Sequence, residues 1–186
     1  AVLDHIDDMT KRIAEIDDIV NDQMQQYEEA RKKLEEMPGI GARSAQVILA
    51  EIGLDMSRFP TAGHLAAWAG LAPGNNESAG KRKSGRTRKG NPTLKTTLIQ
   101  CAKTAKSKKG SFFKAQFDRL AVRRGKNRAV VAVAHSMLIA IYHMLKFDTP
   151  FTDLGENYYC QFNAEKKINH HLKQLQKLGW QCPIPA

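Results

Sequence analysis

Residues 127–146, which read NRAVVAVAHSMLIAIYHMLK, form the most apolar stretch of the chain. Its large apolar side chains recur at helical spacing and also fill the flanking faces, so a helix here would be apolar around most of its circumference. Such a helix is stable only when other elements cover it, and we therefore expect it to be almost wholly buried. The residues that carry this prediction are Val130, Val131, Val133, Ala134, Met137, Leu138, Ile141 and Leu145.

Other segments have the apolar spacing of packed helices, and strand signals are poor throughout, so the predicted fold class is all-α. Trp68 and the Phe112, Phe113 and Phe117 set fall at helical spacing and are interpreted as core residues rather than base-stacking platforms. His135 and His143 are interpreted as core or edge histidines. The predicted helices are 61–70, the segment from Leu94 to Ala105, 111–124 and, more weakly, 164–178.

The segment 38–53, PGIGARSAQVILAEIG, has a glycine-bracketed turn followed by a helix. It looks like a helix-hairpin-helix motif, in which glycines let backbone N–H groups at a helix N-terminus meet a phosphate. Gly39, Gly41 and Arg43 are the candidate contacts. A simple turn between two helices explains the same pattern equally well.

Before Pro38, apolar or tolerant residues alternate at spacings of four and three over five heptads, from Val2 to Met37. This pattern predicts one long helix over 2–37, which Pro38 ends. A lone helix would expose this seam, so we expect a coiled coil, either with a second copy in a homo-oligomer or with another part of a longer chain. Docking against the chain's own domain is the alternative.

The chain has 29 Lys and Arg residues against 19 Asp and Glu residues, a formal charge of +10. Thirteen of the acids lie in 1–55, whereas 81–128 holds seventeen cations and a single acid, Asp118. So uneven a distribution predicts a polyanionic partner for the second segment, and DNA is favoured over an acidic membrane surface or a merely solvated face. No run of 18 apolar residues occurs, so no membrane span is expected.

The loop 74–92 is the centre of this basic segment and has no apolar periodicity, so it is expected to be mobile without a partner. Glycine-spaced Lys and Arg side chains contact the nucleic-acid backbone more readily than base edges. The predicted phosphate-binding residues are Lys81, Arg82, Lys83, Arg86, Arg88 and Lys89.

The three cysteines, Cys101, Cys160 and Cys182, are odd in number and widely spaced, which is typical of reduced thiols. A zinc site built from Cys160, His170, His171 and Cys182 matches no zinc-ligand spacing, and no metal site is predicted.

Several short motifs occur in order within roughly 34–154. They are Met37-Pro38-Gly39-Ile40-Gly41, Phe59, Ala69-Gly70-Leu71-Ala72-Pro73, Glu77-Ser78, Arg88-Lys89-Gly90-Asn91, and Phe117 with Arg119-Leu120. Together they resemble the C-terminal transposase domain of the DEDD-type insertion-sequence transposases, the bridge-RNA-guided serine recombinases. The preceding helix looks like the coiled coil that joins this domain to the rest of such a protein.

This resemblance implies a DNA transposase or recombinase in which a serine attacks a phosphodiester and holds one DNA end as a phosphoserine. The family's serine follows a glutamate, so Ser78 after Glu77 is the implied nucleophile, and Ser84 is the weaker rival. The family commonly has basic or aromatic residues just upstream, where this chain has Asn75-Asn76. The resemblance also implies a guide RNA, and Mg²⁺ held by a RuvC-like domain in a part of the protein outside this chain.

The predicted division is a coiled-coil helix at 1–37, a helical transposase domain at 38–154 and a helical tail at 155–186. Because the chain begins with Ala inside a helical pattern, we expect a fragment of a longer cytoplasmic, nucleoid-associated bacterial protein. Two other hypotheses remain open. One is a non-catalytic nucleic-acid-binding module in which Ser78 is incidental, and the other is a dimerising scaffold built on the long helix.

Overall fold

The computed structural model describes residues 2–74, 76–159 and 164–179, with the side chains of all of these except residues 76, 77, 82, 83 and 164–167. The fold is mostly helical, which confirms the predicted all-α class. The elements are α1 Val2–Met24, η1 Gln25–Tyr27, α2 Glu28–Glu35, α3 Ala42–Ile52, η2 Met56–Arg58, α4 Ala62–Trp68, β1 Asn76–Ser78, β2 Lys81–Ser84, α5 Pro92–Ala105, α6 Phe112–Arg124, α7 Lys126–Phe147 and α9 Ala164–Lys177.

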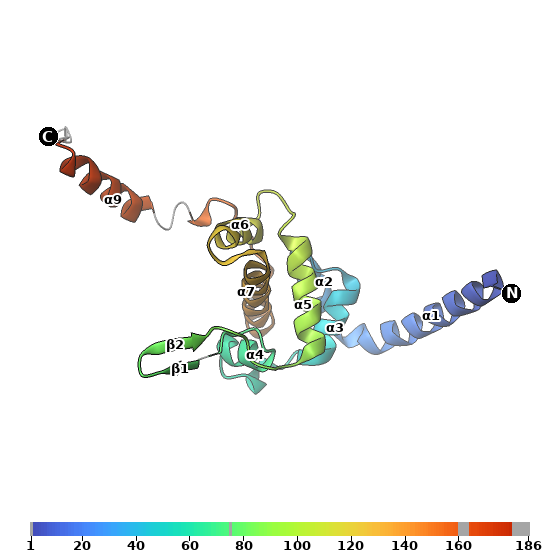
Figure 1. The fold of residues 1–186 in the computed structure, drawn as a ribbon. Helices are drawn as coiled ribbons and strands as arrows, with labels where there is room; N and C mark the ends of the chain where they lie inside the picture. The colour runs from blue at the N-terminus through green and yellow to red at the C-terminus, as the bar shows by residue number, and fades with distance from the viewer. Residues whose placement is uncertain (1, 75, 160–163, 180–186) are drawn as a thin grey trace.

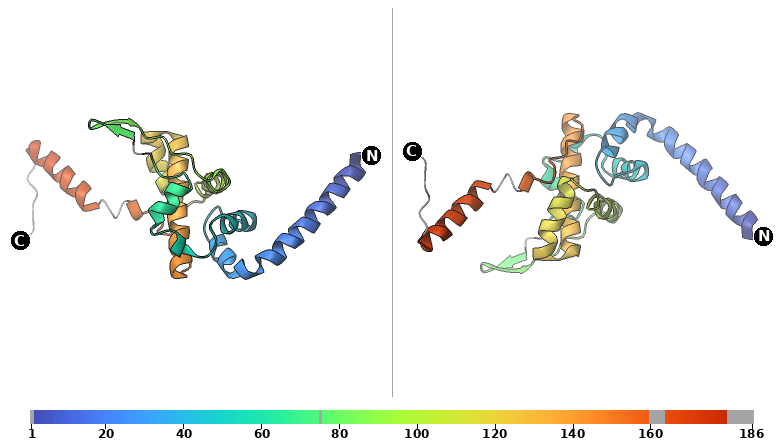
Figure 2. Two further views of the ribbon diagram at one scale, coloured as in Figure 1. Left: turned by 90° about the horizontal axis from the view of Figure 1, so that it is seen from below. Right: turned by 90° about the horizontal axis from the view of Figure 1, so that it is seen from above.

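Residues 127–146 form the core helix α7 as predicted, but the helix is less completely buried than expected, since Val131 and Leu145 are only partly buried. It packs against α4, α5 and α6, and the views in Figure 2 show it running through the centre of the helical body. Its Tyr142 hydroxyl donates a hydrogen bond to the Phe59 carbonyl oxygen at 3.0 Å and so ties α7 to the segment before α4. By length and composition α7 is the one described helix that passes as a membrane span, but nine of its residues are buried among the other helices.

The predicted helix boundaries agree with the structure because capping residues mark them. Thr61 caps α4, Asn91 caps α5 ahead of Pro92, and Ser111 caps α6, each through a side-chain oxygen that accepts from the backbone N–H three residues further along the chain. Gly125, with φ +84°, separates α6 from α7. Phe113 and Phe117 are buried as expected. Trp68 is not a core residue, because its side chain is 42% exposed and contacts Phe59 at the surface.

The expected continuous helix over 2–37 is wrong in one respect, because the 3-10 turn η1 interrupts it. Beyond η1, Leu34 and Met37 are fully buried in the domain core. Before it, α1 runs away from the domain as a single exposed rod, shown in blue in Figure 1. The heptad pattern continues across the break because both halves need an apolar stripe, and the pattern alone does not distinguish the surfaces that each half faces. The exposed apolar residues of α1 are Val2, Leu3, Ile6, Met9, Ile13, Ile16 and Ile19.

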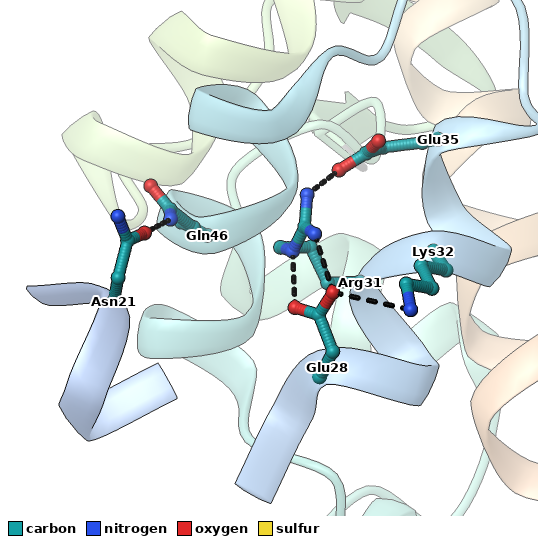
Figure 3. Close-up of polar contacts among 6 residues, drawn as sticks. All are labelled: Asn21, Glu28, Arg31, Lys32, Glu35 and Gln46. Atoms are coloured by element: carbon teal, nitrogen blue, oxygen red, sulfur yellow. Dashed lines mark hydrogen bonds and ion pairs between the residues drawn. The ribbon is translucent and has the colours of Figure 1, made fainter. Parts of the chain in front are cut away.

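Polar contacts fix the direction in which α1 leaves the domain. Asn21 accepts a hydrogen bond from the Gln46 amide of α3 at 3.0 Å, as Figure 3 shows. Arg43 at the start of α3 forms an ion pair with Asp17 at 2.7 Å. Directly after η1, Arg31 bridges Glu28 and Glu35 along one face of α2.

Gly39 in the turn between α2 and α3 lies against the backbone of α5. A Cβ atom placed on Gly39 would be 2.4 Å from the Cys101 carbonyl oxygen and 2.7 Å from the Ala105 nitrogen. Its φ of +88° also lies in the region that favours glycine. The turn followed by a helix that the sequence predicts for 38–53 is present between α2 and α3, and Gly39 is required in this turn for packing.

Replacing Gly39 with Ala is expected to lower the free energy of unfolding by about 3 kcal/mol or more, because strain at positive φ adds to overlap with α5. Gly41→Ala is the matched control, since a Cβ at Gly41 has nothing within 4 Å. The control should cost less than about 1 kcal/mol. Urea denaturation followed by circular dichroism measures both, and equal losses would contradict the packing role of Gly39.

The hydrogen bond from Arg31 lowers the pKa of Glu28 from its ordinary 4.5 to about 2. The stabilisation from this pair is therefore present in full above pH 4.5 and is lost as the pH falls towards 2. Arg31→Gln should return the Glu28 pKa most of the way to 4.5, whereas Lys32→Gln should raise it less. Titration of the Glu28 carboxyl carbon by NMR measures these values, and a larger effect of the Lys32 change would refute the assignment.

Candidate nucleic-acid interface

The centre of the basic loop folds as an antiparallel β-hairpin of β1 and β2, although the sequence shows no apolar periodicity there. Ser78 pairs with Lys81, and Glu77 with Arg82, across a two-residue turn. Both turn residues have positive φ, +51° at Ala79 and +72° at Gly80, which is the geometry that matches the twist of paired strands. An Asn or Asp usually precedes the glycine in such turns, and because Ala stands there instead, the usual hairpin signal is missing from the sequence.

Two glycines attach the base of the hairpin to α4. A Cβ atom on Gly90 would lie 2.3 Å from the Gly70 nitrogen, and one on Gly70 would lie 2.9 Å from the Arg88 carbonyl oxygen. The two backbones can cross this closely only because neither residue has a side chain. Gly74 N–H also donates to the Arg86 carbonyl oxygen at 3.1 Å. The hairpin therefore projects from an anchored base, as the green arrows in Figure 1 show.

Side chains on α5 and α3 hold the returning strand. The Asn91 side-chain oxygen accepts from Leu94 N–H at 2.9 Å, and its amide nitrogen donates to Glu51 at 2.6 Å. The Lys95 ammonium donates to the Thr87 hydroxyl at 2.9 Å. These contacts give the Arg88-Lys89-Gly90-Asn91 motif a structural role, which is to turn the chain from the hairpin into α5.

Ser78 lies at the exposed end of β1, next to the turn. Directly opposed residues of a hairpin lie on the same face, with Cβ atoms about 4.5–5.5 Å apart, so Lys81 is the cation that the register places beside Ser78. Within the described part of the chain, the Ser78 hydroxyl has no hydrogen bond. The rival Ser84 is half-buried, and its hydroxyl oxygen accepts from Arg86 N–H at 3.1 Å. Ser78 is thus the more available of the two hydroxyls.

The four described cations of the loop, Lys81, Arg86, Arg88 and Lys89, are all exposed. None of them forms an ion pair with a carboxylate among the residues that the structure describes. Arg82 and Lys83 belong to β2, but their side chains lie outside the described set, as do Asn75 and the side chain of Asn76. An exposed group of like charges without acidic partners is suited to an anionic ligand.

The three candidates at the α2–α3 turn are not equally placed for a phosphate. Gly39 is packed against α5, and Arg43 is engaged by Asp17. Gly41 is the N-cap of α3, no side chain caps this end, and the space beside it is open. The first N–H groups of α3 are therefore the part of this turn that a phosphate can reach.

No group of three or more His, Cys, Asp or Glu side chains suitable for a metal ion occurs in the described residues. His170 and His171 are exposed neighbours on α9, whereas Cys160 and Cys182 lie outside the described residues. Cys101 is buried, and burial raises the pKa of its thiol, as expected for a packing residue. His135 is half-buried, and burial lowers its pKa, whereas His143 is exposed and stacks on Phe147.

Two basic residues that the sequence did not single out, Arg124 and Arg128, face the base of the hairpin across a groove that Arg86 also lines. They flank Gly125, where α6 ends and α7 begins. The run RRGKNR at 123–128 is the sequence feature that could have indicated them, but it lies between two apolar helices and was counted only in the overall charge.

The Phe117 and Arg119-Leu120 motif lies on α6. Phe117 is buried, Arg119 lies over the Tyr159 ring at 4.0 Å, and Leu120 lines the same groove.

Part of the chain is similar to known transposase sequences. Residues 31–118, just under half of the chain, match the profile of the transposase IS116/IS110/IS902 family. The chain is 34% identical over 119 residues to the insertion element IS110 uncharacterized 43.6 kDa protein of Streptomyces coelicolor, covering 62% of this chain and 29% of that protein. It is 31% identical over 118 residues to the putative transposase y4pF/y4sB of Sinorhizobium fredii, covering 59% of this chain and 30% of that one. The chain thus spans under a third of these relatives.

Proposed function

We propose that this chain is the DNA-handling part of an insertion-sequence transposase of the IS110 type, and that Ser78 is its nucleophile. The observation that carries the proposal is the position of Ser78, exposed at the end of an anchored hairpin, opposite Lys81 and among cations without acidic partners in the described part of the chain. The match of 31–118 to a transposase family supports the same function, because that region contains the whole hairpin.

The chemical step requires the Ser78 oxygen to attack a phosphorus atom of DNA. The Ser78 hydroxyl gives up its proton as a bond from Oγ to phosphorus forms and one phosphorus–oxygen bond to a sugar breaks, and the departing sugar oxygen takes up a proton. Attack by a sugar hydroxyl of another DNA end then reverses the step and restores the serine. Lys81 lies on the same face as Ser78, where its charge stabilises the negative charge that develops on the phosphoryl oxygens.

Other parts of the proposed machinery come from outside the described residues. The Mg²⁺ that the resemblance implies is assigned to a RuvC-like domain in another part of a longer protein. Selection of the DNA sequence is assigned to a guide RNA, because exposed Lys and Arg side chains contact the nucleic-acid backbone rather than the bases. The setting is the bacterial cytoplasm, on nucleoid DNA.

Assembly is assigned to α1, and the helical domain at 38–154 is assigned to DNA. The apolar side chains of α1 from Val2 to Ile19 are exposed along a helix that stands clear of the domain, which fits a coiled coil in a homo-oligomer. The open N-terminus of α3 at Gly41 supplies a second phosphate contact, as a helix-hairpin-helix motif does. The first part of the tail 155–186 packs against α6, because Tyr158 and Tyr159 contact the Phe112 ring.

The exposed cations of the loop 74–92 should account for most of the salt dependence of DNA binding. Replacing Lys81, Arg88 and Lys89 with Ala should reduce the magnitude of the log-log salt slope by about 0.9 for each phosphate of duplex DNA that is no longer neutralised. Alanine at Lys11, Lys173 and Lys177, which are exposed on α1 and α9, removes the same charge and should leave the slope nearly unchanged. Fluorescence anisotropy at several salt concentrations measures the slopes, and equal slopes in both variants would show that only net charge matters.

Ser78→Ala should abolish the covalent protein–DNA adduct and strand exchange while leaving DNA binding intact. The test uses a full-length protein that contains this chain, incubated with donor DNA, target DNA and guide RNA, then denatured and examined for DNA attached to protein. Ser84→Ala is the control and should retain the adduct, because that hydroxyl is engaged by Arg86 N–H. An adduct that survives Ser78→Ala would place the nucleophile elsewhere.

The second candidate function is a non-catalytic nucleic-acid-binding module. The exposed cations of the hairpin, uncompensated within the described residues, favour it independently of Ser78. Normal DNA binding with no adduct from the unaltered full-length protein would support this alternative.

A further inference from the structure

A groove of about 980 Å³ lies between the base of the hairpin and helices α6 and α7. Its apolar walls include Leu71 before the hairpin, Leu120 on α6 and Val131 on α7. Arg86, Arg124 and Arg128 lie on its lining as well, and all three are exposed. The groove therefore combines an apolar surface with a concentrated positive charge, and neither Ser78 nor the end of the hairpin forms part of it.

A buried polar side chain in this lining has an unused hydrogen-bonding atom. Gln116 on α6 is 9% exposed, and its amide nitrogen donates to the Ser136 hydroxyl of α7 at 2.7 Å. Its other amide atom, Oε1, has no hydrogen-bond partner among the described residues. A hydroxyl can donate or accept, so either orientation of the amide leaves one polar atom unpaired. An unpaired buried polar atom lowers stability, and a ligand that pairs with it removes this penalty.

The start of α7 adds a site for an anion at the edge of the groove. Gly125 is the N-cap of α7 and makes no side-chain capping hydrogen bond, so the first N–H groups of the helix lack a side-chain partner in the described structure. Arg124 precedes this end and Arg128 lies in its first turns. Two guanidinium groups, together with the positive end of a 22-residue helix, are suited to one phosphate.

We infer that this groove binds one unpaired nucleotide of a nucleic-acid strand, with the phosphate held by Arg124 and Arg128 and the base inserted against Leu120 and Val131. Gln116 Oε1 accepts a hydrogen bond from an exocyclic amine or ring N–H of the base. The inference rests on the proposed nucleic-acid function and adds a base-contacting site to it. The hairpin cations then bind the backbone, whereas the groove holds a base that has left its stack.

The test uses the 186-residue chain and a single-stranded DNA dodecamer that carries one central 2-aminopurine, a purine whose fluorescence rises when it leaves a base stack. No Trp, Tyr or Phe lines the groove in the described structure, so insertion should raise the 2-aminopurine emission rather than quench it. Binding is measured in parallel by anisotropy of an end label. The same strand annealed to its complement should show a smaller rise, because its base is paired.

Two double variants distinguish a specific site in the groove from a non-specific effect of positive charge. Arg124→Ala with Arg128→Ala removes the groove arginines, and Arg123→Ala with Lys126→Ala removes the same charge from neighbouring exposed residues outside the groove. The groove variant should bind the dodecamer about tenfold or more weakly and lose the emission rise. The control variant should retain the rise and bind within about threefold of the unaltered chain.

Gln116→Leu distinguishes a ligand contact from a structural one. It removes both the unpaired acceptor and the hydrogen bond to the half-buried Ser136 hydroxyl, two changes with opposite effects, so thermal stability should change little. The affinity advantage of the dodecamer over one with an abasic site at the same position should disappear. A large drop in stability with the advantage intact would assign Gln116 to packing and overturn the inference. Equal behaviour of the two double variants would also overturn it and leave the hairpin proposal standing, whereas absence of any binding by the unaltered chain would refute both.

Discussion

Helix α7 is buried between α4, α5 and α6, and this burial decides where the neighbouring elements can lie. Its alanines Ala129 and Ala134 are fully buried, so the surrounding helices approach the α7 backbone closely. Burying a large apolar side chain contributes about 1.5–3 kcal/mol, and Met137, Leu138 and Ile141 make such contributions together. The segments that join the surrounding helices must therefore run on the surface, where the hairpin and the basic groove are found.

In the hairpin, the base is held against the helical domain while the turn stays exposed. The hairpin base is fixed by the crossing of Gly70 and Gly90 and by the hydrogen bonds of Asn91, but its turn carries no large apolar side chain that could hold it against the domain. A hydroxyl at such a turn is available to a large substrate such as DNA. No group of three or more His, Cys, Asp or Glu side chains suited to a metal ion occurs in the described residues, so the proposed attack by Ser78 relies on a base or metal ion from elsewhere in a longer protein.

Helices α4, α5 and α6 could be predicted from the sequence because each has both an apolar face and a capping side chain, whereas α3 and α7 begin at glycines and are predicted from their apolar residues. Ser111 and Gly125 bracket α6, and Asn91 with Pro92 begins α5, so local chemistry and tertiary packing agree at these points. The family resemblance rests on motifs that include Gly70, Gly90 and Asn91, which the structure brings together at the hairpin base.

Three features could not be predicted, each for a physical reason. The η1 break leaves the heptad pattern intact, because a helix that pairs with another chain and one that docks on its own domain need the same stripe. The hairpin uses Ala79 at positive φ, which sequence preferences disfavour. The groove is formed by side chains from segments that are distant in sequence, such as Leu71 and Val131, and the unpaired atom of Gln116 is recognisable only once Ser136 has been placed.

The 3-10 turn at Gln25–Tyr27 is also the point about which α1 would rotate relative to the domain. A helix of 23 residues is about 34 Å long, so a rotation of about ten degrees at the turn moves its far end by about 6 Å. The contacts of Asp17 and Asn21 with α3, and the packing of Val20 and Met24 against the core, oppose that rotation, and all four residues lie in the last third of α1, nearer to the turn than to its far end. A small shift of α1 at its contacts with α3 therefore corresponds to a much larger displacement at its exposed N-terminal end.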